Sequence, residues 1–373
     1  MRFTRLIVAL LTVFAFSARS VAMAGRAKPS ADGYFQAVVR VASGVWVLAE
    51  PRFQVQPIGN VTVIEQADGL VLVDAGGSAG AGRRIVELVR SISPKPVKAI
   101  FLSQWHGDKV QGLSELLRAW PNARTIATAQ TRAHLADPKT MNTPATPDAA
   151  RNAAVAKDQL DTAAYMEGNV AKAKVPAQQQ GFAAASRVFR QYAQDVDGTL
   201  TIAPKEGFAD RLVIDDRRRP VEARFLGRAN TDGDAVVWLP RQRILVAGET
   251  VIAPFPYGYE SYPESWIEVL GKLRALHFQT LIPGHGPPER DARQLDRIGA
   301  ALLAVEAQVA PLARRGLTLA QVQAKVDFTT QQHSFVGDDP WLGLWFKAFW
   351  VEPIVGSAYK EATGQPIVQG LTP

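Results

Sequence analysis

The chain has 373 residues, 47% hydrophobic and 21% charged, and this ordinary composition predicts one large or two small folded cores rather than disorder. The formal charge of +7 would fall to +4 if the first 24 residues, with their three arginines and no acid, were removed, which is too small a surplus to indicate a nucleic-acid-binding surface. The absence of cysteine excludes disulfides and thiolate zinc sites, so histidine, carboxylate or amide groups must hold any metal.

Residues 1–24 have the features of a secretory signal peptide. Two arginines precede an apolar run at 6–16, and Ala22 and Ala24 supply the small residues that cleavage after Ala24 requires. The run is too short to cross a membrane, which takes roughly 20 residues, and no later segment is long enough. We therefore expect a periplasmic or secreted protein that has no membrane anchor after cleavage.

Residues 44–103 are predicted to form strands of a packed sheet with one helix. Short β-rich runs separated by Gly or Pro predict strands, and apolar residues at helical spacing between Ile85 and Ile92 predict a helix. The predicted order is strands at 44–50, 60–66 and 69–77, a helix at 83–92 and a strand at 97–103.

The pattern becomes helical at about 131–205, where Ala and Gln replace the β-branched runs, and this indicates a helical insertion. Strands are then predicted at 211–215, 221–227, 234–240, 243–249 and 280–284, with a helix near 264–276. From residue 291 to residue 373 we predict a helical C-terminal extension, because apolar residues from Leu295 to Leu312 form one helix face and Thr318 with Gln321 fits a capping box.

The stretch "FLSQWHGDKVQG" (101–112) contains the first candidate site residues. His106 and Asp108 follow an apolar strand, and ligands of open α/β sheets gather beyond the carboxyl ends of strands. Four further stretches complete a set in fixed order: "LVDAGG", "GRANTDGDAVVWLP", "VAGE" and "IPGHG".

This ordered set resembles the metallo-β-lactamase superfamily over about residues 38–290. The resemblance implies a four-layer αβ/βα sandwich, here assigned to residues 25–290. Family members hold two zinc ions with four sequence features. These are a His-x-His-x-Asp-His loop, a further His before Thr-x-Gly, an Asp after Gly, and the His of Gly-His-Gly. A hydroxide between the ions attacks an ester, amide, thioester or phosphate.

Carried over position by position, this chain keeps only part of that ligand set. Three positions are retained, one carboxylate is lengthened and three histidines are replaced. The retained residues are His106, Asp108 and His285; Glu249 stands for the second Asp; Gln104, Lys109 and Asn230 stand where the family has histidine.

These replacements disfavour two zinc ions. Amide oxygens are weaker donors than imidazole, and a lysine ammonium beside Zn²⁺ opposes binding. Two arrangements stay open. The retained His106, Asp108, Glu249 and His285 could hold a single zinc, iron or manganese ion. Alternatively, Lys109 takes the place of a metal and pairs with Asp108 and Glu249.

Other residues complete the predicted site. Asp108 and Lys109 are the candidate catalytic groups, and Asp74 of "LVDAGG" is expected to support the site without binding an ion. Aromatic rings are expected to contact an apolar part of a small-molecule ligand, with the helical insertion as a lid. These rings are Trp105, Tyr257 and Tyr259.

Two functions are compatible with this reading. The first is an exported hydrolase with an altered metal site, acting on an ester, lactone or amide. The second is a pseudoenzyme that keeps the fold and cleft as a binding protein. The residues around the ligand positions match the family while several ligands themselves are replaced. Random loss of function would be expected to change both, so a site with a new role is favoured over an inactivated one.

Overall fold

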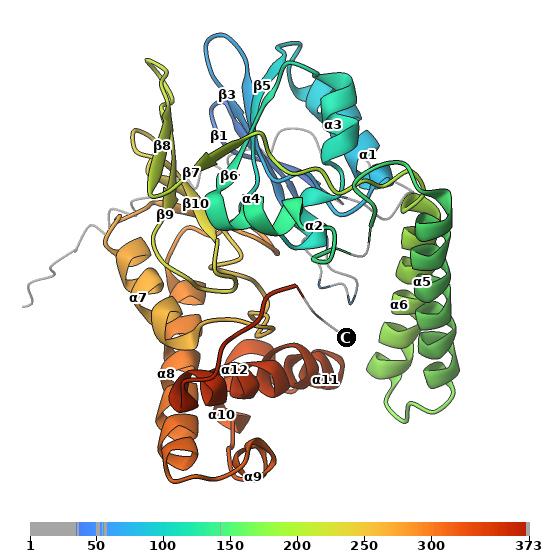
Figure 1. The fold of residues 1–373 in the computed structure, drawn as a ribbon, viewed down its shortest axis with the longest axis vertical. Helices are drawn as coiled ribbons and strands as arrows, with labels where there is room; N and C mark the ends of the chain where they lie inside the picture. The colour runs from blue at the N-terminus through green and yellow to red at the C-terminus, as the bar shows by residue number, and fades with distance from the viewer. Residues whose placement is uncertain are drawn as a thin grey trace, which may run out of the picture.

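Two β-sheets packed face to face form the centre of the fold (Figure 1). The computed structural model describes residues 35, 37–49, 53, 55, 58–141 and 143–370, so the predicted signal peptide lies outside the described residues. The first sheet is antiparallel from β1 to β4 and parallel from β4 to β7. Its strands are β1 (Ala37–Ala42), β2 (Val45–Ala49), β3 (Val61–Glu65), β4 (Leu70–Val73), β5 (Val97–Phe101), β6 (Arg124–Thr128) and β7 (Glu206–Phe208).

The second sheet has the order β12-β11-β10-β9-β8, and only β11 and β12 are parallel. Its strands are β8 (Arg211–Ile214), β9 (Val221–Phe225), β10 (Ala235–Leu239), β11 (Ile244–Gly248) and β12 (Thr280–Pro283).

Alternation of side chains along the strands builds three apolar layers. In β4, Val71 and Val73 face the other sheet while Leu70 and Leu72 face outward. In β10 the odd-numbered residues join the layer between the sheets, and Val236 and Trp238 face outward. Successive strand residues point to opposite faces of a sheet. Since the residues on both faces are apolar and buried, each sheet is covered on both sides.

Helices cover the two outer faces. On the first sheet they are α1 (Ala79–Ile92), α2 (Gly107–Val110), α3 (Leu113–Ala119) and α4 (Ala129–Ala136). On the second sheet they are α7 (Pro263–Arg274) and α8 (Arg293–Arg314). The predicted four-layer αβ/βα sandwich is therefore confirmed.

The helical insertion is a hairpin of α5 (Ala149–Val170) and α6 (Pro176–Asp195), which stands beside the sandwich in Figure 1. The predicted helical C-terminal extension is present. After α8 it comprises α9 (Leu319–Gln323), α10 (Thr329–Val336), α11 (Pro340–Phe346), the π-helical turn η1 (Lys347–Val351) and α12 (Glu352–Thr363). Among the described residues, no helix combines the length and apolarity needed to cross a membrane.

The insertion and the extension meet. Phe182 of α6 packs edge-on against Trp341 of α11 with ring centroids 5.0 Å apart. A Cβ at Gly181 would lie 2.2 Å from the Trp341 ring, so α6 can approach α11 only through a glycine at this position. The two helical additions thus flank the same end of the sandwich.

We predict that Gly112→Ala destabilises the fold by about 1–3 kcal/mol, the usual cost of overpacking. Gly112 is the N-cap residue of α3, and a Cβ there would lie 2.1 Å from the Ala75 carbonyl oxygen, 3.0 Å from Gly82 Cα and 3.1 Å from Gly82 N in α1. All three are backbone contacts, so no side chain can move aside.

Urea unfolding would measure this cost. Gly168→Ala in α5 is the matched control, because its Cβ meets no atom within 4 Å and alanine is up to about 1 kcal/mol better than glycine in a helix. Equal effects of the two substitutions would contradict the packing argument.

Candidate functional site

The candidate site lies beyond the carboxyl ends of strands from both sheets. The 101–112 motif begins at the last residue of β5 and continues into the loop after it. Glu249 directly follows β11, and His285 lies two positions after the end of β12. The two sheets are joined here by a hydrogen bond from Ala235 N to Ser103 O at 2.7 Å. Gly248 permits the approach, since a Cβ there would lie 2.9 Å from Ser103 Cβ.

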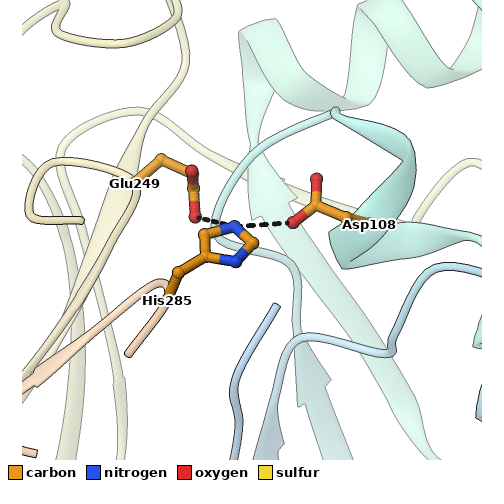
Figure 2. A group of neighbouring side chains, drawn as sticks. All are labelled: Asp108, Glu249 and His285. Carbon is orange, nitrogen blue, oxygen red and sulfur yellow. Dashed lines mark ion pairs between the residues drawn. The ribbon is translucent and has the colours of Figure 1, made fainter. Parts of the chain in front are cut away.

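Three of the predicted metal ligands converge. His285 Nε2 lies 3.1 Å from Asp108 Oδ2 and 3.2 Å from Glu249 Oε1, and Figure 2 shows the two carboxylates approaching the imidazole from different sides. His285 Nδ1 lies 3.1 Å from Ile58 O and therefore donates its proton to that carbonyl. The ligand atoms of these three side chains all lie within 4.8 Å of one another.

Lys109 reaches the same point and is completely buried. Its Nζ lies 2.7 Å from Glu249 Oε1 and 3.5 Å from Asp108 Oδ2, and it donates a hydrogen bond to Gly284 O at 2.7 Å. A Cβ at Gly59 would lie 2.4 Å from Nζ, so a glycine at that position leaves the space that the ammonium fills. The sequence alone left the orientation of Lys109 open, and the structure directs it inward.

Charge balance determines the pKa values in this group. Burial alone would raise the pKa of Asp108 and of Glu249, but the neighbouring Lys109 and His285 hold both below their ordinary range. Burial would likewise lower the pKa of Lys109 and of His285, yet the carboxylates outweigh burial and raise both. Asp108, Lys109, Glu249 and His285 thus form one buried centre, in which the Lys109 ammonium contacts both carboxylates.

The other positions where the family has histidine are arranged differently. His106 lines the adjacent cavity and packs edge-on against Trp105 with ring centroids 4.4 Å apart, but it does not join the compact group of ligand atoms. Burial lowers the pKa of His106 and favours a neutral ring. Gln104 is fully buried, and among the described residues neither of its amide atoms has a hydrogen-bond partner. Asn230 donates from Nδ2 to Tyr257 O at 2.7 Å.

Asp74 supports the motif loop and has no contact with the compact group. Its carboxylate accepts hydrogen bonds from Ser103 N at 2.7 Å and Ser103 Oγ at 2.9 Å. Its backbone has a φ of 70°, a left-handed conformation that Asp and Asn tolerate better than most residues. Burial raises the pKa of Asp74 to about 6.

A cavity of about 730 Å³ opens beside the compact group. Asp108 and Glu249 line it, whereas Lys109 and His285 do not. One side is aromatic, and Lys139 and Arg151 of the insertion segment supply cations. The aromatic residues are Trp105, Tyr257, Tyr259 and Phe349.

Two cavity residues, Tyr192 and Phe349, and one residue that contacts the cavity wall, Gln369, were not predicted from the sequence. Tyr192 of α6 places its hydroxyl 3.0 Å from Gly77 O and 2.8 Å from Gln111 Oε1. Phe349 of η1 packs edge-on against Tyr257 with centroids 5.6 Å apart. Gln369, in the coil after α12 that runs back toward α2 in Figure 1, accepts a hydrogen bond from Trp105 Nε1 at 3.0 Å. All three come from segments outside the quoted motifs.

Comparison with known proteins identifies the family. The model of the metallo-beta-lactamase superfamily matches residues 56–285. The chain belongs to the metallo-beta-lactamase superfamily. A linear primary-alkylsulfatase from Pseudomonas sp. (strain ATCC 19151) is 22% identical in an alignment 254 residues long. The match covers 63% of this chain and 43% of that protein, so the chain spans less than half of this relative.

A solved structure with low sequence identity shares the fold. The stereoselective inverting sec-alkylsulfatase Pisa1 from Pseudomonas sp. is similar with a TM-score of 0.59 and 15% identity, covering 87% of this chain and 50% of that one. A metallo-beta-lactamase from Pontibacter korlensis matches with a TM-score of 0.48 and 18% identity, covering 71% of this chain and 98% of that one.

Members of the superfamily typically bind metal, and the described residues provide one candidate group, Asp108, Glu249 and His285. An ion bound to Glu249 Oε1 at ~2.2 Å would lie within about 5 Å of Lys109 Nζ, because Nζ is 2.7 Å from the same oxygen. At an effective dielectric constant of ~20, a divalent ion and an ammonium about 5 Å apart repel by about 7 kcal/mol. The three donors are suitable for a metal, but the four-residue centre with Lys109 in place is not.

We predict that Asp74→Asn costs about 1 kcal/mol of stability and that Asp74→Ala costs at least twice as much. Asparagine keeps one acceptor for Ser103 and tolerates the positive φ, whereas alanine leaves two buried donors without an acceptor. Urea denaturation of both variants would measure the difference. Alanine proving as stable as asparagine would show that the Ser103 contacts contribute little.

We also predict that Gln369→Ala releases the coil after α12. Gln369 bridges Trp105 and Glu260 O, and Gly370 N donates to Glu260 Oε2 at 3.0 Å. Hydrogen–deuterium exchange of a peptide covering residues 364–373 should become faster, while the free energy of unfolding changes by no more than about 2–3 kcal/mol, the value of two hydrogen bonds. Gln365→Ala, at an exposed position in the same coil, should leave exchange unchanged.

Proposed function

We propose that this protein is an exported binding protein for small amphiphilic anions, such as alkyl sulfates and related esters, built on the fold of a metal-dependent hydrolase. The observation that carries the proposal is the composition of the cavity. An aromatic side formed by Tyr257, Tyr259 and Phe349 suits an alkyl chain, and Lys139 and Arg151 suit an anionic head group.

The carboxylates in the cavity do not prevent this. Both Asp108 and Glu249 contact the buried Lys109 ammonium and lie beside His285 Nε2, and neither Lys109 nor His285 lines the cavity. Glu260 is the remaining acid of the lining, and it accepts a hydrogen bond from Gly370 N. An anion entering the cavity therefore meets less negative charge than the lining residues alone suggest.

The relatives support the ligand class. Both the linear primary-alkylsulfatase and the sec-alkylsulfatase are named for sulfate esters of alkyl chains. The export part of the proposal rests on the signal-peptide features of residues 1–24.

A second candidate is a hydrolase with at most one metal ion, zinc, iron or manganese, acting on an ester, lactone or amide. The arrangement of Asp108, Glu249 and His285 favours it, because two carboxylates and an imidazole are good ligands for such an ion. Membership of a hydrolase superfamily is compatible with both candidates.

We predict that octyl sulfate, used well below its micelle concentration, binds with one site per chain in isothermal titration calorimetry and that octanol binds at least five-fold more weakly. Lys139→Gln and Arg151→Gln should each weaken octyl sulfate binding about five-fold, since one charge contributes on the order of 1 kcal/mol in a partly solvated cavity. Lys157→Gln is the matched control, because Lys157 lies on α5, pairs with Asp161 on the surface and does not line the cavity.

Turnover assays separate the two candidates. Release of inorganic sulfate from octyl sulfate, or cleavage of an ester panel after reconstitution with zinc, iron or manganese, would support the hydrolase. Equal affinity for octanol and octyl sulfate, with no effect of the two cavity variants, would remove the amphiphilic-anion proposal.

A further inference from the structure

Lys109 contacts the atoms that a metal ion would contact. Its Nζ and His285 Nε2 both approach Glu249 Oε1, at 2.7 and 3.2 Å, and both face Asp108 Oδ2. The ammonium also binds the Gly284 carbonyl at 2.7 Å. The same side chain therefore touches all three of the chain segments that follow β5, β11 and β12.

The surrounding backbone holds this lysine in place. Lys109 O accepts a hydrogen bond from Ala75 N at 2.7 Å, and Lys109 N donates to His106 O at 3.0 Å. Glycines provide the room, since a Cβ at Gly59 would lie 2.4 Å from Nζ and a Cβ at Gly284 would lie 2.1 Å from Glu249 Oε1. Both the backbone hydrogen bonds and the glycines therefore fit a lysine whose buried position is part of the fold.

The Lys109 ammonium already supplies the two carboxylates with a positive charge. Its Nζ lies 2.7 Å from Glu249 Oε1 and 3.5 Å from Asp108 Oδ2, the same oxygens that face His285. A divalent ion added to this group would leave it with excess positive charge in a buried position, which is strongly unfavourable.

We propose that the Lys109 ammonium is a built-in replacement for the metal ion: it joins the loops of the two sheets and makes the centre independent of metal. This inference goes beyond ligand binding in the cavity. It predicts that the wild-type protein, stripped with a chelator, binds zinc weakly and keeps the same melting temperature with and without EDTA.

The decisive variant is Lys109→Met, which removes the charge and keeps an unbranched apolar side chain. Zinc affinity, measured by competition with a chromogenic chelator, should rise at least 100-fold over the wild type with one ion per chain. The variant should have a lower melting temperature than the wild type in EDTA and should recover in zinc. Lys109→Met combined with Glu249→Gln should lose the gained zinc affinity.

Lys95→Met is the matched control. Lys95 Nζ also contacts one carboxylate, Glu65 at 2.8 Å, and one carbonyl, Gln66 O at 2.8 Å, but its side chain is 33% exposed and it precedes β5, at the opposite end of that strand from the motif loop. Its zinc affinity should equal that of the wild type.

Two results would overturn the inference. One is a wild-type chain that binds one zinc ion with submicromolar affinity and melts at a lower temperature in EDTA, a measurement that needs no variant to fold. The other is a folded Lys109→Met protein whose zinc affinity matches the wild type. Neither result bears on octyl sulfate binding, so failure of this inference and failure of the proposed function can be told apart.

Discussion

The contact between the buried Lys109 ammonium and Glu249 is the interaction on which the rest of the site depends. An ammonium without any exposed surface is tolerable only if carboxylates and carbonyls surround it, because removing one partner of a buried pair costs roughly 3–5 kcal/mol. Asp108, Glu249 and the Gly284 carbonyl come from three loops and two sheets, so the position of one side chain fixes how the strand ends meet. This is the mechanical task that a bridging ion performs in a metal centre.

The contacts around the centre explain how an ion or an ammonium could occupy it without a change in the course of the motif loop. Asp74 holds the motif loop through Ser103, and Ser103 O in turn receives the Ala235 amide of the other sheet. Gly112 fits against Ala75 with no room for a side chain. None of these contacts involves a ligand position, and the loop therefore keeps its course whether an ion or an ammonium occupies the middle.

The fold could be predicted from the sequence, but the contacts of the site could be predicted only in part. The short β-rich run in "GLVLVDAGG" located β4, and the predicted Thr318–Gln321 capping box is present, because both patterns depend on neighbours in the chain. The short β6 and β7 and helix α3 were not predicted, since their local patterns are weak. The convergence of Asp108, Glu249 and His285 followed from the family's motif order.

The contacts of the site that could not be predicted from the sequence are those made between segments far apart in the chain. The sequence did not decide whether Lys109 faces the site or the solvent, because neighbouring residues in the chain do not determine the direction of a long side chain. The glycine that makes room for it, Gly59, is 50 positions away. His106 was grouped with the other candidate ligands, but it packs against Trp105 and remains on the cavity wall. Tyr192 and Phe349 line the cavity, and Gln369 contacts Trp105 on its wall, because the insertion and the extension pack beside it. No periodicity within either segment predicts these contacts.

The division of the site into a buried layer and a cavity layer has a chemical consequence. Lys109 and His285 contact Asp108 and Glu249 from positions that do not line the cavity, while the cavity wall is drawn from the motif loop, the segment after β11, the insertion and the extension. The two buried partners of the carboxylates are thus separate from the aromatic and cationic groups that would select a ligand. Substitutions in Phe349 or Arg151 can alter the cavity without disturbing the ion pairs, because neither residue contacts Lys109 in the described structure. A site built in this way can exchange its ligand and keep its fold, whereas a site whose ligand coordinates a structural ion cannot change one without the other.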